Sequence, residues 1–449
     1  MLVLTPFVLV VVSAVTNAQS GLAPKKFLSL PLGAITPTGW LHDQLMVQTN
    51  GLAGHEHEFY DYVAQTDWVG GDSYYSYLEE AGSYWFNGMV PNGVLVNDTT
   101  IKSQTQQFLD YVLDHQDETG WLGPEVNTTK PRYLWGRYPF FFGAIQMVEA
   151  DPSLTDRVVT AFYKFISLAN TMLHNGEGLE EWAETRWEDF VITLQWLYDL
   201  HPNSQEDLLI DTMKMLKWTG DPWESVFDEQ YFPTGPVEDL ENPFPVLTWH
   251  GVNMAEGLKA LPATYRFTHN QSVGDQIVTD MWSRQYLQEQ NQIAAQNMTP
   301  NPFPEDGPYS NVFGLEPNYP CCTVNHPQGW PKFISNSFLT TPDQESLVHL
   351  YLGPFSTQTT LAGGNTVSAS VDTLYPFGDT LTTTIMAEKA FTYYVRIPSW
   401  VTNGTITVNG GSAQPVSPQN GLHAVKASAG ITKFILNLPA EIMTGKCIF

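Results

Sequence analysis

Residues 365–397, NTVSASVDTLYPFGDTLTTTIMAEKAFTYYVRI, decide the fold class, because the spacing of apolar residues changes here to a period of two. Such alternation is typical of strands with one buried face. Further along, the dipeptide Asn409-Gly410 is a hairpin turn signal. We therefore predict an antiparallel β-domain, a β-sandwich, over residues 345–449. The alternating positions are Val367, Ala369, Val371, Leu381, Thr383, Ile385, Phe391, Tyr393, Val395 and Ile397.

The chain before this region follows a helical period. Val158, Phe162, Phe165, Ala169 and Met172 recur at steps of three and four, which predicts an amphipathic helix. A second apolar stretch, from about residue 179 to 200, predicts another helix. The loops are rich in Gly, Pro, Trp and Tyr, as expected of a helical toroid whose inter-helix turns line a central cleft. Further helices are expected to start near Gly39, Tyr74, Ile101, Arg137, Ser204, Val252, Gln276 and Pro327, the one at Ile101 behind the N-cap residues Thr99 and Thr100.

Composition narrows the ligand class. The 449 residues contain 20 Lys plus Arg against 47 Asp plus Glu, which gives a net charge of −27. Nucleic acids and anionic membrane surfaces attract basic proteins, so neither is an expected partner. Aromatic residues make up 13% of the chain and include 14 Trp, and their flat rings suit amphipathic ligands such as sugars.

The N-terminus resembles an export signal. Residues 1–18, MLVLTPFVLVVVSAVTNA, are apolar and end in small and polar residues, which favours a secretory signal peptide over a membrane anchor. No later stretch has the roughly 18 uninterrupted apolar residues of a spanning helix. We therefore expect a secreted, extracellular protein without a membrane segment after signal removal, and no feature sets its oligomeric state. Glycosylation is expected at the sequons Asn97, Asn127, Asn270, Asn297 and Asn403.

Two acidic runs offer candidate chemistry. The run His55-Glu56-His57-Glu58 has metal-type side chains, but alternate residues diverge on a helix and no third ligand is evident, which argues against a metal site. Glu180, Glu184 and Glu188 are spaced for one helical face, and we interpret them as a solvated acidic stripe partly offset by Arg186. Asp189 follows this stripe and adds no specific signal.

The adjacent thiols Cys321 and Cys322 differ in kind from these runs. The chain has three Cys, too few and too unevenly spaced for a disulfide-stabilised exported protein, and the third is Cys447. The adjacent pair is compatible with a strained disulfide, with two buried small residues, or with two ligands of a soft cation. In the last case a zinc ion would keep both sulfurs as thiolates, and either one would be a nucleophile at neutral pH.

The segment around this pair resembles the Cys-Cys motif of the β-L-arabinofuranosidase family, glycoside hydrolase family 127. Gly-Leu-Glu-Pro-Asn precedes the pair at residues 314–318, and Gln-Gly-Trp-Pro-Lys-Phe follows it at residues 328–333. The resemblance runs from about residue 28 to the end of the chain. It also includes the motifs Gly120-Trp121-Leu122-Gly123-Pro124, Trp182-Ala-x-x-Arg186-Trp187, Trp196-Leu197-Tyr198-Asp199, His250-Gly251-Val252-Asn253 and Val395-Arg396-Ile397-Pro398-Ser399-Trp400.

The resemblance implies a fold, a reaction and site residues. The fold would be an (α/α)6-barrel-like helical toroid over residues 28–340, followed by the β-sandwich. The reaction would be retaining hydrolysis that removes a terminal furanose of β-L-arabinofuranose type from a plant or cell-wall glycan. Cys321 would be the catalytic nucleophile, Cys321 and Cys322 would bind zinc, and His250 would contact the substrate.

The chain departs from the family pattern between His250 and Cys321. The family supplies a Glu-x-Cys pair to the zinc and a separate Glu as general acid/base from this region, and no Glu-x-Cys occurs here. We therefore expect an internal deletion, a shortened C-terminus and an incomplete zinc site, and the acid/base Glu cannot be assigned. An alternative is a catalytically inactive sugar-binding homologue. A polysaccharide lyase is disfavoured, because lyases need basic residues to neutralise a uronate.

Overall fold

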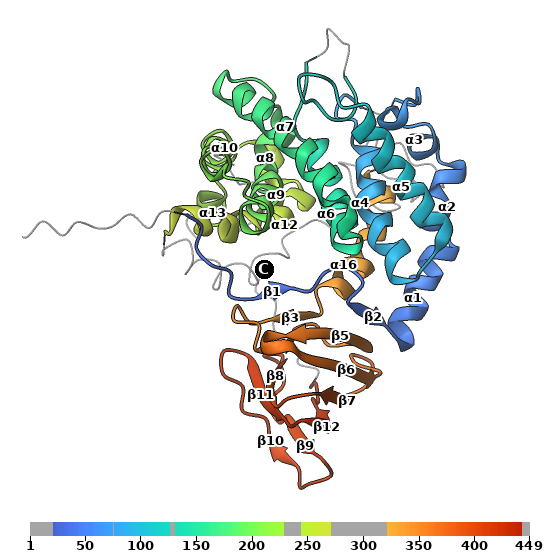
Figure 1. Cartoon of the computed structure of the whole chain (residues 1–449), viewed down its shortest axis with the longest axis vertical. Coiled ribbons are helices and arrows are strands. Elements are labelled where there is room, and N and C mark those ends of the chain that lie inside the picture. Colours follow the sequence, from blue (N-terminus) through green and yellow to red (C-terminus); the bar gives the residue numbers. More distant parts are fainter. Residues whose placement is uncertain (1–20, 75, 126–130, 229–243, 271–320, 442–449) are drawn as a thin grey trace, which may run out of the picture.

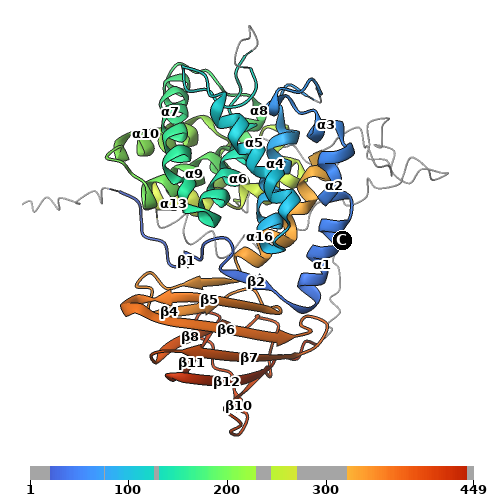
Figure 2. The same cartoon turned by 45° about the vertical axis from the view of Figure 1, so that its right-hand side comes forward.

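The computed structural model describes residues 21–74, 76–125, 131–228, 244–270 and 321–441, with the side chains of Cys321 and Cys322 outside this description. Its helices form one part of the molecule and its strands another (Figures 1 and 2). Within these residues, no helix is long and apolar enough to cross a membrane. The longer helices are α1 (Gly39–Asn50), α2 (Leu52–Phe59), α4 (Glu80–Leu95), α5 (Thr99–Asp114), α6 (Arg137–Ala150), α7 (Thr155–His174), α9 (Trp187–Leu200), α10 (Glu206–Thr219) and α13 (Ala260–Thr268).

Short helices connect these elements and carry much of the site. They are α3 (Asp61–Ala64), α8 (Glu181–Thr185), α11 (Trp223–Val226), α12 (Gly251–Gly257), α15 (Cys321–Asn325) and α16 (Gly329–Ser335). Single 3-10 turns add η1 (Asp67–Val69), η2 (Pro152–Leu154), η4 (Val246–Trp249) and η6 (His326–Gln328).

Helix α4 lies at the centre of the helical part and packs against α5, α6, α15 and α16. It is buried along nearly all its length, as expected of a helix without a polar face. Glycine permits the closest approach: a Cβ on Gly88 would lie 3.2 Å from Cγ of Gln328, in the turn after α15. The orange helix α16 lies beside α4 in both overall views.

The helical predictions are confirmed in part. All five periodic residues of α7 are buried. The helical stretch expected over 179–200 is confirmed but divided, because Arg186 adopts non-helical angles and separates α8 (Glu181–Thr185) from α9 (Trp187–Leu200). The N-cap of α5 is Asp98, whose carboxylate accepts the Ile101 N–H at 2.8 Å, and not Thr99 or Thr100. The helix expected near Tyr74 begins at Glu80, and the one near Gln276 lies outside the described residues.

The strands form two sheets. The five-stranded sheet has the order β1-β3-β4-β8-β11, and the seven-stranded sheet has the order β10-β9-β12-β7-β6-β5-β2. Every strand pair is antiparallel except β4 with β8, which is parallel and was not predicted. The strands are β1 (Leu28–Ser29), β2 (Ile35–Pro37), β3 (Phe338–Thr340), β4 (Ser346–His349), β5 (Phe355–Leu361), β6 (Asn365–Thr373), β7 (Thr380–Ala387), β8 (Phe391–Arg396), β9 (Thr405–Val408), β10 (Gln414–Pro415), β11 (Leu422–Ala427) and β12 (Gly430–Asn437).

The period-two prediction is confirmed for the inner face of the sheets. The alternating positions of β6, β7 and β8 are buried, except Phe391, which is half-buried. Asn409 and Gly410 both have positive φ and form the turn after β9. Strands β1 and β2, which the sequence did not predict, pair with β3 and β5, and so tie the N-terminal residues to the sheets beneath the helices.

Candidate functional site

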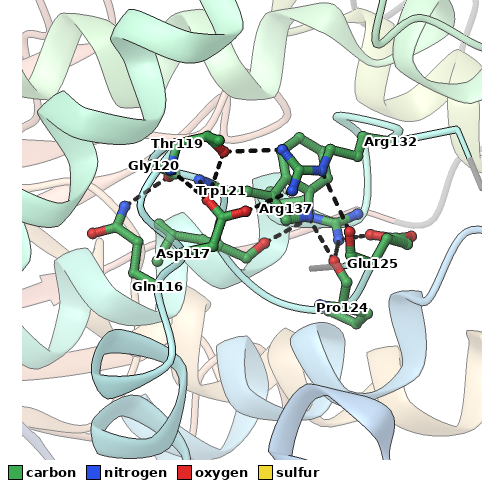
Figure 3. A network of polar contacts seen from close by, with 10 residues as sticks. Gln116, Asp117, Thr119, Gly120, Trp121, Pro124, Glu125, Arg132 and Arg137 are labelled. Carbon is green, nitrogen blue, oxygen red and sulfur yellow. Dashed lines mark hydrogen bonds and ion pairs between the residues drawn. The ribbon is translucent and has the colours of Figure 1, made fainter. Parts of the chain in front are cut away.

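The loop before α6 is held by buried ionic and backbone contacts (Figure 3). One carboxylate oxygen of Asp117 accepts the backbone N–H of Thr119 at 2.9 Å and of Trp121 at 3.0 Å. The other oxygen of Asp117 accepts from the Arg132 guanidinium at 2.6 Å. These contacts fix the first half of the Gly120–Pro124 motif.

Arg137 fixes the second half of this loop. Its side chain is fully buried, is paired with Glu125, and donates to the carbonyls of Leu122 at 3.0 Å and Pro124 at 2.9 Å. Its guanidinium lies 4.3 Å from the centroid of the Trp121 ring, a cation–π contact. The motif therefore has a structural role.

Arg186, at the break between α8 and α9, is the centre of a cluster of polar and aromatic residues. It is 4% exposed, donates from Nε to the Asn253 side chain at 2.7 Å, and donates to the hydroxyl of Tyr84. The guanidinium also lies 5.0 Å from the ring centroids of both Trp135 and Trp182. Elements far apart in the sequence, namely α4, the loop before α6, α8 and α12, thus converge on one cation beside two indole rings.

His250 joins this cluster from the N-cap of α12. Its ring centroid lies 5.6 Å from that of Trp182, in an edge-on arrangement, and the residue is exposed. Partial shielding of the ring from water and the nearby Arg186 charge both lower the pKa of His250. A neutral imidazole that is open to solvent beside an indole can donate or accept a hydrogen bond from a polar ligand.

Glu180, against Trp182, and Glu80, near the Arg186 charge, also lie at this cluster. Glu180 is the N-cap of α8, and its oxygens accept the backbone N–H groups of Trp182 at 2.7 Å and Ala183 at 2.8 Å. Burial raises the pKa of Glu180 to about 7, against the lowering effect of these bonds. Burial also raises the pKa of Glu80, close to the Arg186 charge. Glu180 can therefore exist as a neutral acid near neutral pH.

The interpretation of Glu180, Glu184 and Glu188 as a solvated stripe is wrong. Glu180 precedes α8, Glu184 is in α8, and Glu188 is in α9, so the three do not share one helix. Glu188 is fully buried, and burial together with the neighbouring Asp189 raises its pKa well above the ordinary value. Asp189, to which the sequence assigned no role, is also buried and is paired with Lys259.

Glu188, Asp189 and Glu256 form the one group of three possible metal ligands among the described residues, with ligand atoms within 4.8 Å of one another. Lys259 and Arg186 already supply cations to this group: Arg186 lies 3.6 Å from a Glu256 oxygen. All its donors are oxygens, whereas zinc prefers sulfur and nitrogen. The cluster is therefore an ionic network of carboxyl groups with Lys259 and Arg186 rather than a zinc site.

The His55–Glu58 run lies on α2 and forms no group of three ligands among the residues described. His55 and Glu58 are exposed and lie 3.0 Å apart, whereas Glu56 is buried and His57 packs 5.2 Å from the Trp85 ring centroid. The helical divergence of alternate residues, expected from the sequence, explains this separation. Burial raises the pKa of Glu56 to about 8.

Cys321 and Cys322 begin the short helix α15, which packs against α4 and α2. Their side chains and Cys447 lie outside the described residues. Two thiols supply half of a tetrahedral zinc set, and the sequence contains no Glu-x-Cys pair to supply the other ligands. The donor set thus does not fit the zinc site that the resemblance implies.

The sequence did not identify Tyr84, Asn253 and Glu256, whose side chains all contact Arg186. Tyr84 is one of many buried aromatic residues on α4, and nothing in its spacing marks a contact with Arg186. Asn253 lies three residues after His250 in a quoted motif, which was the available signal. Trp182 was part of a motif without an assigned role, and Arg186 was expected only to offset the charge of the acidic stripe.

Comparison with known proteins gives the same fold. A GH127 β-L-arabinofuranosidase from Geobacillus stearothermophilus T6 is 13% identical and superposes with a TM-score of 0.59. The match covers 90% of this chain and 81% of that enzyme. A second solved structure, titled glycoside hydrolase, is 13% identical with a TM-score of 0.61 over 92% of this chain and 78% of its own. A GH127 β-arabinofuranosidase is 11% identical, with a TM-score of 0.55, and the match covers 92% of this chain and 81% of that structure.

The sequence comparisons locate the family signal in the β-domain. No curated protein matches the chain. Residues 346–437 match the family described as β-L-arabinofuranosidase, GH127 middle domain, and these residues span strands β4 to β12. Residues 346–437 are therefore similar to the GH127 middle domain, and the chain shares the fold of solved GH127 structures.

Proposed function

We propose that the protein is a secreted retaining glycoside hydrolase that removes terminal furanose residues of β-L-arabinofuranose type from plant or cell-wall glycans. The observation that carries this proposal is the cluster in which the Arg186 guanidinium lies 5.0 Å from the ring centroids of both Trp135 and Trp182, with the exposed His250 edge-on to Trp182. Aromatic faces bind the C–H groups of a sugar, and charged or polar groups between them hold its hydroxyls.

In the proposed reaction, the Cys321 thiolate attacks the anomeric carbon. A sulfur–carbon bond forms, the bond from that carbon to the leaving oxygen breaks, and a neutral carboxyl group protonates the leaving oxygen. Water then attacks the same carbon, the sulfur–carbon bond breaks, and the carboxylate takes a proton from the water. Two inversions give retention of configuration.

Glu80 and Glu180 are the carboxyl groups of this cluster that suit the proton transfer. Both have pKa values raised by burial, and that of Glu180 is raised to about 7, which allows one group to serve as acid and then as base. Since the zinc donor set is incomplete, no step of this reaction is assigned to a metal.

The incomplete donor set favours a second candidate, an inactive sugar-binding homologue. Both candidates predict that the cluster binds a furanoside, and they differ in turnover. Calorimetric titration with methyl β-L-arabinofuranoside tests binding first. Trp182→Ala should weaken binding about tenfold, because one stacking contact contributes roughly 1.4 kcal/mol. Trp218→Ala is the matched control, since Trp218 is 85% exposed on α10; equal binding by both variants would contradict the assignment of the cluster.

A further inference from the structure

The helix that begins with Cys321 and Cys322 has only five residues and is followed by the turn η6 and by α16. One helical turn is not stable on its own, so its position depends on contacts made by the following residues. Buried polar side chains of α1 and α4 make these contacts, together with Gln328 of η6 and Lys332 of α16. We call this set the polar clamp, and it comprises Gln48, Asn87, Asn92, Gln328 and Lys332.

Asn87 of α4 is the centre of the polar clamp and is 3% exposed. Its side-chain oxygen accepts from the ammonium group of Lys332 at 2.9 Å and from the Gln146 amide at 2.9 Å. Its side-chain nitrogen donates to Gln328 at 3.0 Å, and Gln328 in turn donates to Asn325, the last residue of α15. A chain of hydrogen bonds therefore runs from α4 to the end of the Cys-bearing helix.

Gln48 of α1 fixes the backbone of the same turn. Its amide nitrogen donates to the carbonyl of Pro327 at 2.9 Å and to the Asn92 side chain at 2.9 Å. Asn92, which is fully buried, donates to the hydroxyl of Thr49 at 2.9 Å. The side of α4 that faces this turn has no side chain at Gly88, where a Cβ would lie within 3.7 Å of Pro327 and closer still to Gln328.

An apolar contact surface would hold two helices together without the desolvation cost of these polar groups. Directional hydrogen bonds instead select one orientation of a short element, because each requires a defined distance and angle. We propose that Asn87 and Gln48 are positioning residues, which hold α15 in one orientation and thereby fix the backbone position of Cys321. The expected effect on catalysis rests on the proposed function, whereas the expected effect on the orientation of α15 does not.

The test is hydrogen exchange of the backbone amides of residues 321–335, measured by mass spectrometry on the full chain. Asn87→Ala removes the centre of the clamp, and exchange in this segment should become about tenfold faster. Gln48→Met keeps the side-chain length, removes both donated bonds, and should give the same local effect if Asn87→Ala does not fold. The matched control is Asn170→Ala, since Asn170 also bridges two helices, α7 and α10, through Asp211 at 2.8 Å and Thr212 at 3.1 Å.

Faster exchange confined to residues 321–335 supports the proposal, whereas unchanged exchange in that segment, or an equal increase in Asn170→Ala, overturns it. A catalytic readout separates positioning from stability: kcat on an aryl β-L-arabinofuranoside should fall at least about tenfold with KM changed less than about twofold, because only the nucleophile is displaced. If the wild-type chain hydrolyses no furanoside, the proposed function fails, and the exchange result still decides the clamp.

Discussion

Replacement of His349 by Phe should remove much of the acid sensitivity of the β-domain. His349, on β4, is fully buried, and its ring stacks on Phe338 with centroids 4.5 Å apart. Burial lowers the pKa of His349 from 6.5 to about 3, so the folded protein keeps this ring neutral at pH values where the unfolded chain protonates it. Phe has a similar size and no titratable group, and the aromatic neighbours can accept its ring.

The magnitude follows from proton linkage. Above pH 6.5 the His349 ring is neutral in both states and contributes no pH dependence. Between pH 6.5 and 3 the unfolded state binds one more proton, so the free energy of unfolding falls by about 1.4 kcal/mol per pH unit. Acidification from pH 7 to pH 4.5 covers about two pH units below the ordinary histidine pKa of 6.5. The free energy of unfolding therefore falls by about 3 kcal/mol.

Urea denaturation of wild type and His349→Phe at pH 7.0 and pH 4.5 measures this loss. The wild-type midpoint should fall more steeply with acidification than that of the variant, and the difference between the two changes should be about 2–3 kcal/mol. Replacement of His55, which is exposed on α2, is the control. An equal acid response of His349→Phe and wild type would refute the reasoning.

Three further outcomes are expected. Arg137→Met should lower the free energy of unfolding by about 3–5 kcal/mol in thermal or urea denaturation, because it leaves the buried Glu125 without its partner, and a loss under 1 kcal/mol would contradict this. Metal analysis of the purified chain should find far less than one zinc, whereas a version with a Glu-x-Cys segment restored should bind one; full zinc in the unmodified chain would show that another group completes the site. N-terminal sequencing of exported protein should start near Gln19, and a start at Met1 would indicate an anchor instead.

Local periodicity predicted the elements whose structure depends on one buried face. The apolar residues of α7 and the alternating residues of β6 lie where their spacing places them, because each needs only a core on one side. The break at Arg186 could not be predicted this way. Its non-helical backbone accompanies contacts to Asn253 and Tyr84, which come from other elements of the fold.

The same limit applies to buried charge. From the sequence alone, Glu188 and Asp189 are expected to be exposed to solvent, because charged residues are rarely buried unless paired. Lys259, which pairs with Asp189, is distant in the sequence and is brought into contact by the packing of α13 and its preceding turn against α9. His250 could be singled out because it belongs to a motif, and the structure places it beside Trp182.

The most direct test of the account is Cys321-dependent hydrolysis. The full chain and its Cys321→Ala variant are incubated with a chromogenic β-L-arabinofuranoside, and the first-formed sugar is followed by proton NMR. The account predicts slow release of arabinose with the β configuration by the wild type, and no release above background by Cys321→Ala. Equal release by the two proteins, or a first product of inverted configuration, would contradict it.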